Sequence, residues 1–219
     1  MLKIRGRNKI LIDGWLLQPY AGKPVYKFDC GDKDLNSFFQ DDVKNHDQTL
    51  MVKTFILSPL GLRLSKQNPP SAFISFLNDS IRKEDFANKR GPWKKLTKKI
   101  PHPKRYKVLP AVKIGRLGVD IKYRHSGMGA MLLNMTRELF LTENRTGCRF
   151  LTVDAYITKN AIDFYTRNGF QFFPDEEKRC EEILKEASKT DDEPKTVAMW
   201  FDLFRVKADI DKNLTPQTA

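Results

Sequence analysis

Cysteine is scarce in this sequence, which has three among its 219 residues: Cys30, Cys148 and Cys180. An odd number at wide spacings matches neither a disulfide framework nor the paired cysteines of a zinc site, so no metal is expected. Cys148 leads into an apolar run and is predicted to be a small buried hydrophobe. A catalytic cysteine is disfavoured, because no histidine lies in a recognisable partner motif.

Long apolar runs are also missing. No stretch approaches the roughly 18–20 apolar residues that a membrane span needs. The basic opening Met1–Arg7 is not followed by the apolar core and small-residue cleavage site of a signal peptide. We therefore expect a cytoplasmic protein without a membrane partner.

Negative charge is under-represented: 39 lysines and arginines face 27 acids, a formal charge of +12. The imbalance is local, since residues 82–110 hold eleven basic residues against only Glu84 and Asp85. Such a block favours a polyanionic partner such as nucleic acid. The alternative is a solvated insertion that only aids solubility.

Apolar periodicity predicts a mixed α/β protein. Helices are expected at residues 34–46 with Asp32 as N-cap, and at 127–143, 161–167 and 176–188. Strands are expected at 49–57 and 72–77, which form a hairpin, and at 111–121, 150–156, 169–173 and 197–204, the last closing the sheet. The prolines of the basic segment argue against a long regular element there.

The strand at 111–121 contains a fault in its alternation. Val112 and Ile114 are apolar at even positions, whereas Leu117, Val119 and Ile121 are apolar at odd ones. A β-bulge at Gly115 or Gly118 produces such a change of parity. The alternative is that Arg116 simply points outward at a strand edge.

A glycine turn follows this strand, with the sequence Arg124-His125-Ser126-Gly127-Met128-Gly129-Ala130 before a helix. The first amides of a helix lack internal partners and its dipole makes that end positive, so a pyrophosphate can bind there once glycines remove the side chains. Arg124 can add a charge-assisted contact and Ser126 a hydroxyl. The motif is neither a P-loop, which needs Gly-Lys-Ser/Thr, nor a dinucleotide fingerprint, which needs glycine where Leu132 stands. By itself, the turn could equally be a simple helix start.

Two motifs together resemble the GNAT superfamily of acetyltransferases. Arg124, Gly127 and Gly129 match its Arg/Gln-x-x-Gly-x-Gly/Ala signature after a strand. The family pattern Asn-x-x-Ala-x-x-Phe-Tyr-x-x-x-Gly-Phe is similar to the run from Asn160 to Phe170, in which Asn and Ala are adjacent. The resemblance is specific from about Leu109 to Phe173. It implies a mixed, mostly antiparallel sheet with a splayed central strand pair and flanking helices, and acetyl-CoA as the donor.

The resemblance also implies roles for particular residues. The pantetheine arm would enter beside Leu117, Gly118 and Val119, where an amide would polarise the thioester carbonyl. The turn would hold the pyrophosphate through Arg124, His125, Ser126, Gly127, Met128, Gly129 and Ala130, while Asn160 and Phe164 would contact the cofactor. Tyr165 would be the general acid, since a pKa near 10 keeps it protonated at neutral pH; it could instead be only a packing residue. Asp154 would hold the substrate ammonium or relay its proton, or be a solvated strand residue.

The N-terminal part is similar to toxin-type members that acetylate aminoacyl-tRNA. The matching residues are Phe28-Asp29-Cys30-Gly31, then Asp34-Leu35-Asn36-Ser37-Phe38-Phe39, and Gly115–Asp120. This implies charged tRNA bound by the basic segment, with Trp93 and Tyr106 stacking on bases, and an antitoxin partner. A homodimer is a further expected assembly.

The expected organisation is one domain over 1–219, with a basic insertion near 82–110 and a charged helical insertion near 175–195. Two other functions stay open. One is an acetyltransferase for a protein amine or a small-molecule amine. The other is a non-catalytic RNA- or protein-binding module on the same scaffold, which the intact motif residues disfavour.

Overall fold

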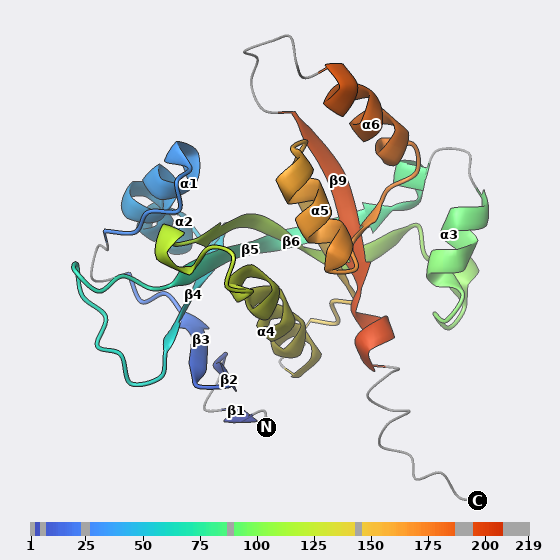
Figure 1. The fold of residues 1–219 in the computed structure, drawn as a ribbon. Helices are drawn as coiled ribbons and strands as arrows, with labels where there is room; N and C mark the ends of the chain where they lie inside the picture. The colour runs from blue at the N-terminus through green and yellow to red at the C-terminus, as the bar shows by residue number, and fades with distance from the viewer. Residues whose placement is uncertain are drawn as a thin grey trace, which may run out of the picture. The chain divides into compact units, whose positions relative to one another are not determined.

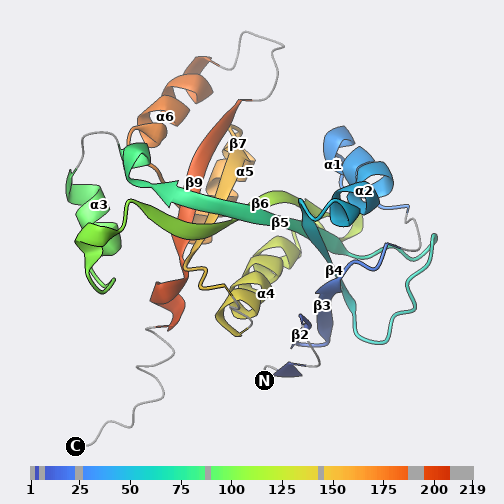
Figure 2. The same cartoon turned by 180° about the vertical axis from the view of Figure 1, so that it is seen from behind.

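A computed structural model describes residues 3–4, 8–22, 27–86, 90–142, 146–186 and 195–207. The chain divides into two compact units (Figures 1 and 2). Unit 1 comprises residues 1–78 and 114–146, and unit 2 comprises 79–113 and 147–219. Two strands, β5 (Ala72–Arg82) and β6 (Val108–Val119), cross from one unit to the other along the chain. The class is mixed α/β with mostly antiparallel strands, as predicted.

Unit 1 begins with strands that the sequence analysis did not predict. They are β1 (Lys3–Ile4), β2 (Ile10–Ile12) and β3 (Trp15–Pro19), paired antiparallel in this order. The β2–β3 hairpin turns at Asp13 and Gly14, which both have positive φ, 47° and 80°. An Asp-Gly pair between apolar runs is a strong signal for this turn, and it was available in the sequence.

The central hairpin of unit 1 was predicted correctly. Strand β4 (Lys53–Pro59) pairs antiparallel with β3 on one side and with β5 on the other. The register aligns Phe55 with Ile74. Strand β4 begins four residues after its predicted start, and both strands extend beyond their predicted ends, so the turn between them starts at Leu60.

The predicted helix at 34–46 forms with a change of winding in its middle. Asp32 caps α1 (Lys33–Ser37) by accepting a hydrogen bond from the Leu35 amide at 3.0 Å. A π-helical turn, Phe38–Asp42, separates α1 from α2 (Val43–Gln48). The turn buries two adjacent phenylalanines, and Phe39 stacks on Phe73 of β5 with ring centroids 4.5 Å apart. These residues form the aromatic core of unit 1 together with Phe28.

Strand β6 shows the predicted fault in alternation. A Cβ added at Gly115 would lie 2.7 Å from the Leu77 side chain, and one added at Gly118 would lie 2.6 Å from Phe73. Residues 73 and 77 of β5 are an even number of positions apart, so their side chains point to the same face of the sheet. Residues 115 and 118 are an odd number apart and would point to opposite faces in a regular strand. The parity therefore changes between the two glycines, and at Gly118 the buried Phe73 ring leaves no room for a side chain.

The other details of this strand differ from expectation. Arg116 does not point outward, because its guanidinium lies 4.1 Å above the Phe38 ring. Ile121 is not part of the strand; it begins a 3₁₀ turn, Ile121–Tyr123, and is 48% exposed. Helix α4 (Met128–Thr142) follows as predicted, and its Leu132, Met135 and Leu139 are buried.

Unit 2 contains the antiparallel strands β7 (Phe150–Tyr156), β9 (Thr196–Asp202) and β8 (Gln171–Phe172), with β9 in the middle. The prediction that the last strand closes the sheet is thus wrong, and Phe204 lies in a helical turn at residues 203–207. Helix α5 (Lys159–Arg167) and helix α6 (Glu176–Glu186) were both predicted. The far end of the predicted charged helix lies outside the described residues.

The basic segment is more ordered than its prolines suggested. It contains a 3₁₀ turn, Lys83–Phe86, the helix α3 (Arg90–Thr97) and a second 3₁₀ turn, Pro103–Arg105. Phe86, Trp93 and Leu96 pack with Phe150 and Trp200 in the core of unit 2. Trp93 and Leu96, three residues apart on helix α3, therefore anchor the insertion in the core of unit 2.

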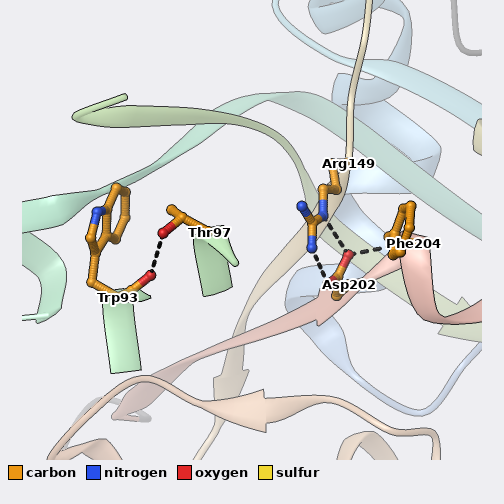
Figure 3. Close-up of polar contacts among 5 residues, drawn as sticks. All are labelled: Trp93, Thr97, Arg149, Asp202 and Phe204. Atoms are coloured by element: carbon orange, nitrogen blue, oxygen red, sulfur yellow. Dashed lines mark hydrogen bonds and ion pairs between the residues drawn. The ribbon is translucent and has the colours of Figure 1, made fainter. Parts of the chain in front are cut away.

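A charged clamp holds the last described turn of unit 2 (Figure 3). Arg149 donates to both carboxylate oxygens of Asp202, at 2.9 and 2.7 Å. Asp202 also accepts from the Phe204 amide at 3.0 Å. Within the described part, no helix is both long and apolar enough to cross a membrane.

Candidate functional site

The glycine turn is shaped by two residues with left-handed backbone, His125 at φ 59° and Gly127 at φ 81°. The Gly127 carbonyl accepts from the Met131 amide at 3.0 Å and so starts helix α4. No heavy atom would lie within 4 Å of a Cβ at Gly127, so the space in front of the helix is open. Alternating left- and right-handed residues direct successive amides to one side and create an anion-binding concavity.

The amides of Met128, Gly129 and Ala130 belong to the first turn of α4 and have no partner inside the helix. The Met128 side chain is buried, so this residue presents only its backbone to the open space. His125, in contrast, is exposed. The arrangement fits a phosphate group that binds bare amides at the positive end of a helix dipole.

Two side chains predicted to contact phosphate hold the turn itself. The Ser126 hydroxyl donates to the Tyr123 carbonyl at 2.6 Å. The Arg124 guanidinium donates to the Cys30 carbonyl and lies beside Gly31, where an added Cβ would be 3.0 Å from the guanidinium. Their contacts with phosphate stay predictions.

The loop that Arg124 holds is locked onto helix α1. One Asp29 carboxylate oxygen accepts from the Gly31 amide at 2.7 Å and from the Asn36 side chain at 2.8 Å. Asn36 in turn accepts from the Cys30 amide at 2.8 Å. The Gly31 and Asn36 donors lower the pKa of Asp29, and Arg124 adds to this. The Phe28–Gly31 and Asp34–Phe39 motifs thus brace the glycine turn, a role that sequence analysis missed.

The predicted pantetheine-contacting residues lie at the end of β6. Leu117 and Val119 are partly exposed, whereas Gly118 is pressed against Phe73. The next residue, Asp120, is buried and caps the 3₁₀ turn by accepting from the Lys122 amide at 3.0 Å. Asp120 is therefore a structural residue, and Leu117–Val119 remain the predicted contacts.

Tyr165 is buried in helix α5, which Thr158 caps by accepting from the Ala161 amide at 3.2 Å. The Tyr165 ring makes edge-to-face contacts with Phe164 and Phe170, at centroid distances of 5.1 and 5.3 Å. Burial raises the pKa of Tyr165 well above its ordinary value, so the hydroxyl keeps its proton at neutral pH. Among the described residues none forms a hydrogen bond with that hydroxyl. A protonated and unshared donor is what a general acid requires.

Two other predicted residues of this helix differ in exposure. Asn160 is exposed in the first turn, where its amide is free to meet a ligand. Phe164 is half-buried and packs edge-on to Tyr165. Their contacts with the cofactor stay predictions.

Asp154 is neither isolated nor simply solvated. Its carboxylate pairs with the ammonium of Lys113 on β6, and its side chain is 47% exposed. Lys113 was not predicted as a site residue, because a lysine between Val112 and Ile114 is ordinary strand alternation. The carboxylate is thus already in contact with an amine of the chain.

The prediction of stacking by Trp93 is wrong. Its indole is 8% exposed and packs edge-on against Phe86 at 5.5 Å, because helix α3 turns this face to the core. Tyr106 is 42% exposed and can still stack on a base. The exposed basic residues of the insertion are Lys94, Lys95, Lys98, Lys99, Lys104, Arg105 and Lys107.

The three cysteines are buried and none forms a disulfide. Burial raises the pKa of Cys148 to about 11, so its thiol is protonated, as expected of a packing residue. Within the described ranges no cluster of His, Cys, Asp or Glu could hold a metal ion.

Comparison with known proteins finds one matching family model. Residues 99–172 match the model of the acetyltransferase (GNAT) domain. None of the curated proteins matches the sequence significantly.

Solved structures of toxins share the fold at low identity. AtaT complexed with acetyl-methionyl-tRNAfMet has a TM-score of 0.63 at 20% identity, over 90% of this chain and 99% of that one. A tyrosine-to-phenylalanine mutant of the AtaT toxin, bound to the C-terminus of the antitoxin AtaR, has a TM-score of 0.60 at 16% identity, over 94% and 100%. AtaTR bound with AcCoA has a TM-score of 0.59 at 17% identity, over 91% and 99%.

Proposed function

We propose that this chain transfers the acetyl group of acetyl-CoA to the α-amine of an aminoacyl-tRNA, because residues 99–172 match the acetyltransferase (GNAT) domain model. The observation that carries the enzymatic part is the buried, protonated Tyr165, whose hydroxyl no described residue engages. A non-catalytic binding module would have no need of such a group. The open amides at Gly127 supply the corresponding site for the pyrophosphate.

The proposed reaction is a direct transfer. The neutral amine attacks the thioester carbonyl, the carbon–sulfur bond breaks, and the departing thiolate takes the proton of the Tyr165 hydroxyl. A backbone amide among Leu117, Gly118 and Val119 donates to the carbonyl oxygen as it gains charge. Asp154 takes the proton that the amine loses, and its ion pair with Lys113 is given up in this step. Arg124, His125 and Ser126 in the turn, and Asn160 and Phe164 on α5, complete the proposed donor site.

The tRNA acceptor is supported by the charge of unit 2. Seven exposed lysines and arginines follow one another from Lys94 to Lys107 with no acid between them. Exposed Tyr106 lies among them and offers a ring for a splayed base. This block would bind the phosphate backbone in a salt-dependent way.

The loop braced by Asp29 and Asn36 corresponds to the motifs that resemble the toxin-type members. We therefore also propose that the chain is the toxin of a toxin–antitoxin pair in the cytoplasm, where charged tRNA is found. Its antitoxin would be a small partner protein, and a homodimer is the proposed assembly of the free enzyme.

Translation arrest tests this proposal. Purified protein added with acetyl-CoA should stop a cell-free translation reaction, and omission of acetyl-CoA should abolish the effect. Tyr165→Phe keeps the aromatic packing but removes the proton, so it should arrest translation about 10²–10⁴ times more slowly. If the wild type leaves translation untouched, the toxin function is wrong. If Tyr165→Phe arrests as quickly as wild type, Tyr165 is not the general acid.

A further inference from the structure

Unit 2 contains a cavity of about 460 Å³ beside the proposed acceptor residue Asp154. Its polar lining comes from the end of β5, from Lys113 of β6, from Thr152 and Asp154 of β7, and from Glu176 at the start of α6. The apolar part of its wall includes Phe173, Pro174 and Ala198. A space of this size suits an amino-acid-sized group.

The cavity exists because the side chains of β9 change size along one face. Trp200 pairs with Thr152, and Ala198 pairs with Asp154 two residues further on. The large side chain of Trp200 is buried in the core with Phe150. The small side chain of Ala198, in contrast, leaves open space next to Asp154. The pocket is therefore built by the strand register.

The charges around the cavity do not balance. Among the described lining residues there are four acids, Asp79, Asp85, Asp154 and Glu176, and two cations, Arg82 and Lys113. Two of these acids pair with cations: Asp154 with Lys113, and Glu176 with Arg179 at 2.7 Å. Asp85 is exposed and accepts from the Arg82 backbone amide at 2.6 Å. In a chain of +12, this cavity is a local exception.

Asp79 is the partly buried acid of the cavity that has no cationic partner among the described residues. The hydroxyl of Thr152, which is 4% exposed, donates to one of its oxygens, and the Ser80 amide donates to the other at 2.8 Å. Within the described part of the chain, no cation forms an ion pair with it. A partly buried carboxylate that is held in place but not neutralised favours a cationic ligand.

We propose that this cavity receives the side chain of the acceptor's amino acid, and that Asp79 selects a cationic side chain such as that of lysine. The inference rests on the proposed function, because Asp154 in the same cavity is the group that meets the reacting α-amine. The side-chain amine of lysine has a pKa near 10.4, so it enters as an ammonium while the α-amine reacts in its neutral form. Phe173 and Pro174 would cover the aliphatic stem.

The test compares two acceptors that differ in one charge. A single tRNA is charged either with lysine or with norleucine, which lacks the ammonium, and kcat/KM for acetylation is measured for both. The wild type should prefer the lysyl acceptor by about tenfold or more, the effect of one charge-assisted hydrogen bond. Asp79→Asn keeps acceptor atoms for Thr152 and Ser80, so it should lose that preference while it retains the norleucyl rate.

Two further variants make the result specific. Thr152→Val removes the hydroxyl that orients Asp79 and should reduce the preference. Glu182→Gln removes an acid on α6, which pairs with Lys178 at 3.7 Å outside the cavity, and should leave the preference unchanged. Equal rates for both acceptors in the wild type, or an unchanged preference in Asp79→Asn, would overturn the inference about the cavity but not the proposed acetyl transfer. Acetylation of neither charged tRNA would instead overturn the proposed function.

Discussion

At the scale of single residues, the glycine turn depends on backbone conformations that few residues adopt. Gly127 has a φ of 81° and open space where a Cβ would be. A glycine is therefore favoured here by backbone conformation and not by packing inside the protein, and the open space leaves room for the proposed phosphate. Gly118 is the opposite case, because Phe73 occupies the place of its Cβ.

Gly127→Ala separates conformation from ligand binding. Gly147 has a φ of 76° with nothing within 4 Å of its Cβ, so Gly147→Ala is a matched control in unit 2. Each variant should lower the free energy of unfolding by about 1–2 kcal/mol, the cost of left-handed backbone in alanine. Only Gly127→Ala should also weaken acetyl-CoA binding, by about tenfold in a calorimetric titration. Equal acetyl-CoA affinity in both variants would contradict a pyrophosphate site at the turn.

At the scale of elements, periodicity predicted the helices at 34–46 and 127–143 and the central hairpin, because each has a strong apolar pattern. The fault in β6 was also visible, since the parity of its apolar residues changes beside two glycines. The first hairpin was missed although Asp13-Gly14 signalled it. The order of β8 and β9 could not be read from sequence, because it depends on long-range pairing that local patterns do not specify.

The basic insertion was misjudged for a physical reason. Its positive charge suggested that Trp93 stacks on bases. Trp93 and Leu96, however, lie three residues apart on the buried face of α3, and Ile100 packs against the same core four residues later. Similarly, the Asp79–Thr152 and Lys113–Asp154 contacts join residues far apart in the chain. Such pairs are set by strand register and are not visible in a local motif.

Two aromatic substitutions test this reading of the insertion. Trp93→Ala should lower the free energy of unfolding by about 3–5 kcal/mol, because it empties part of the core. Tyr106→Ala should change it by about 0.5 kcal/mol or less, since the ring is 42% exposed. Tyr106→Ala should instead weaken tRNA binding by about 1–3 kcal/mol in a filter-binding assay. Loss of tRNA affinity in a well-folded Trp93→Ala protein, with none in Tyr106→Ala, would reverse the assignment.

At the scale of the whole molecule, a chain of +12 has most of its net positive charge in one insertion and an acid-rich cavity in the same unit. In the proposed function these features have separate tasks: the insertion binds RNA phosphates, and the cavity receives the amino acid. The donor site uses backbone amides and a protonated tyrosine. Fold, domain type and donor follow from motifs with defined spacing, whereas the acceptor depends on charge placement.

The most direct measurement follows labelled acetyl groups from acetyl-CoA to a panel of acceptors: aminoacyl-tRNA, the same tRNA without its amino acid, a basic peptide and a polyamine. We expect label to be transferred to aminoacyl-tRNA alone and to be recovered as an N-acetyl amino acid when mild base cleaves the ester. Transfer should weaken as salt rises, because phosphate contacts release counterions. Label on the peptide or polyamine but not on aminoacyl-tRNA would contradict the central claim.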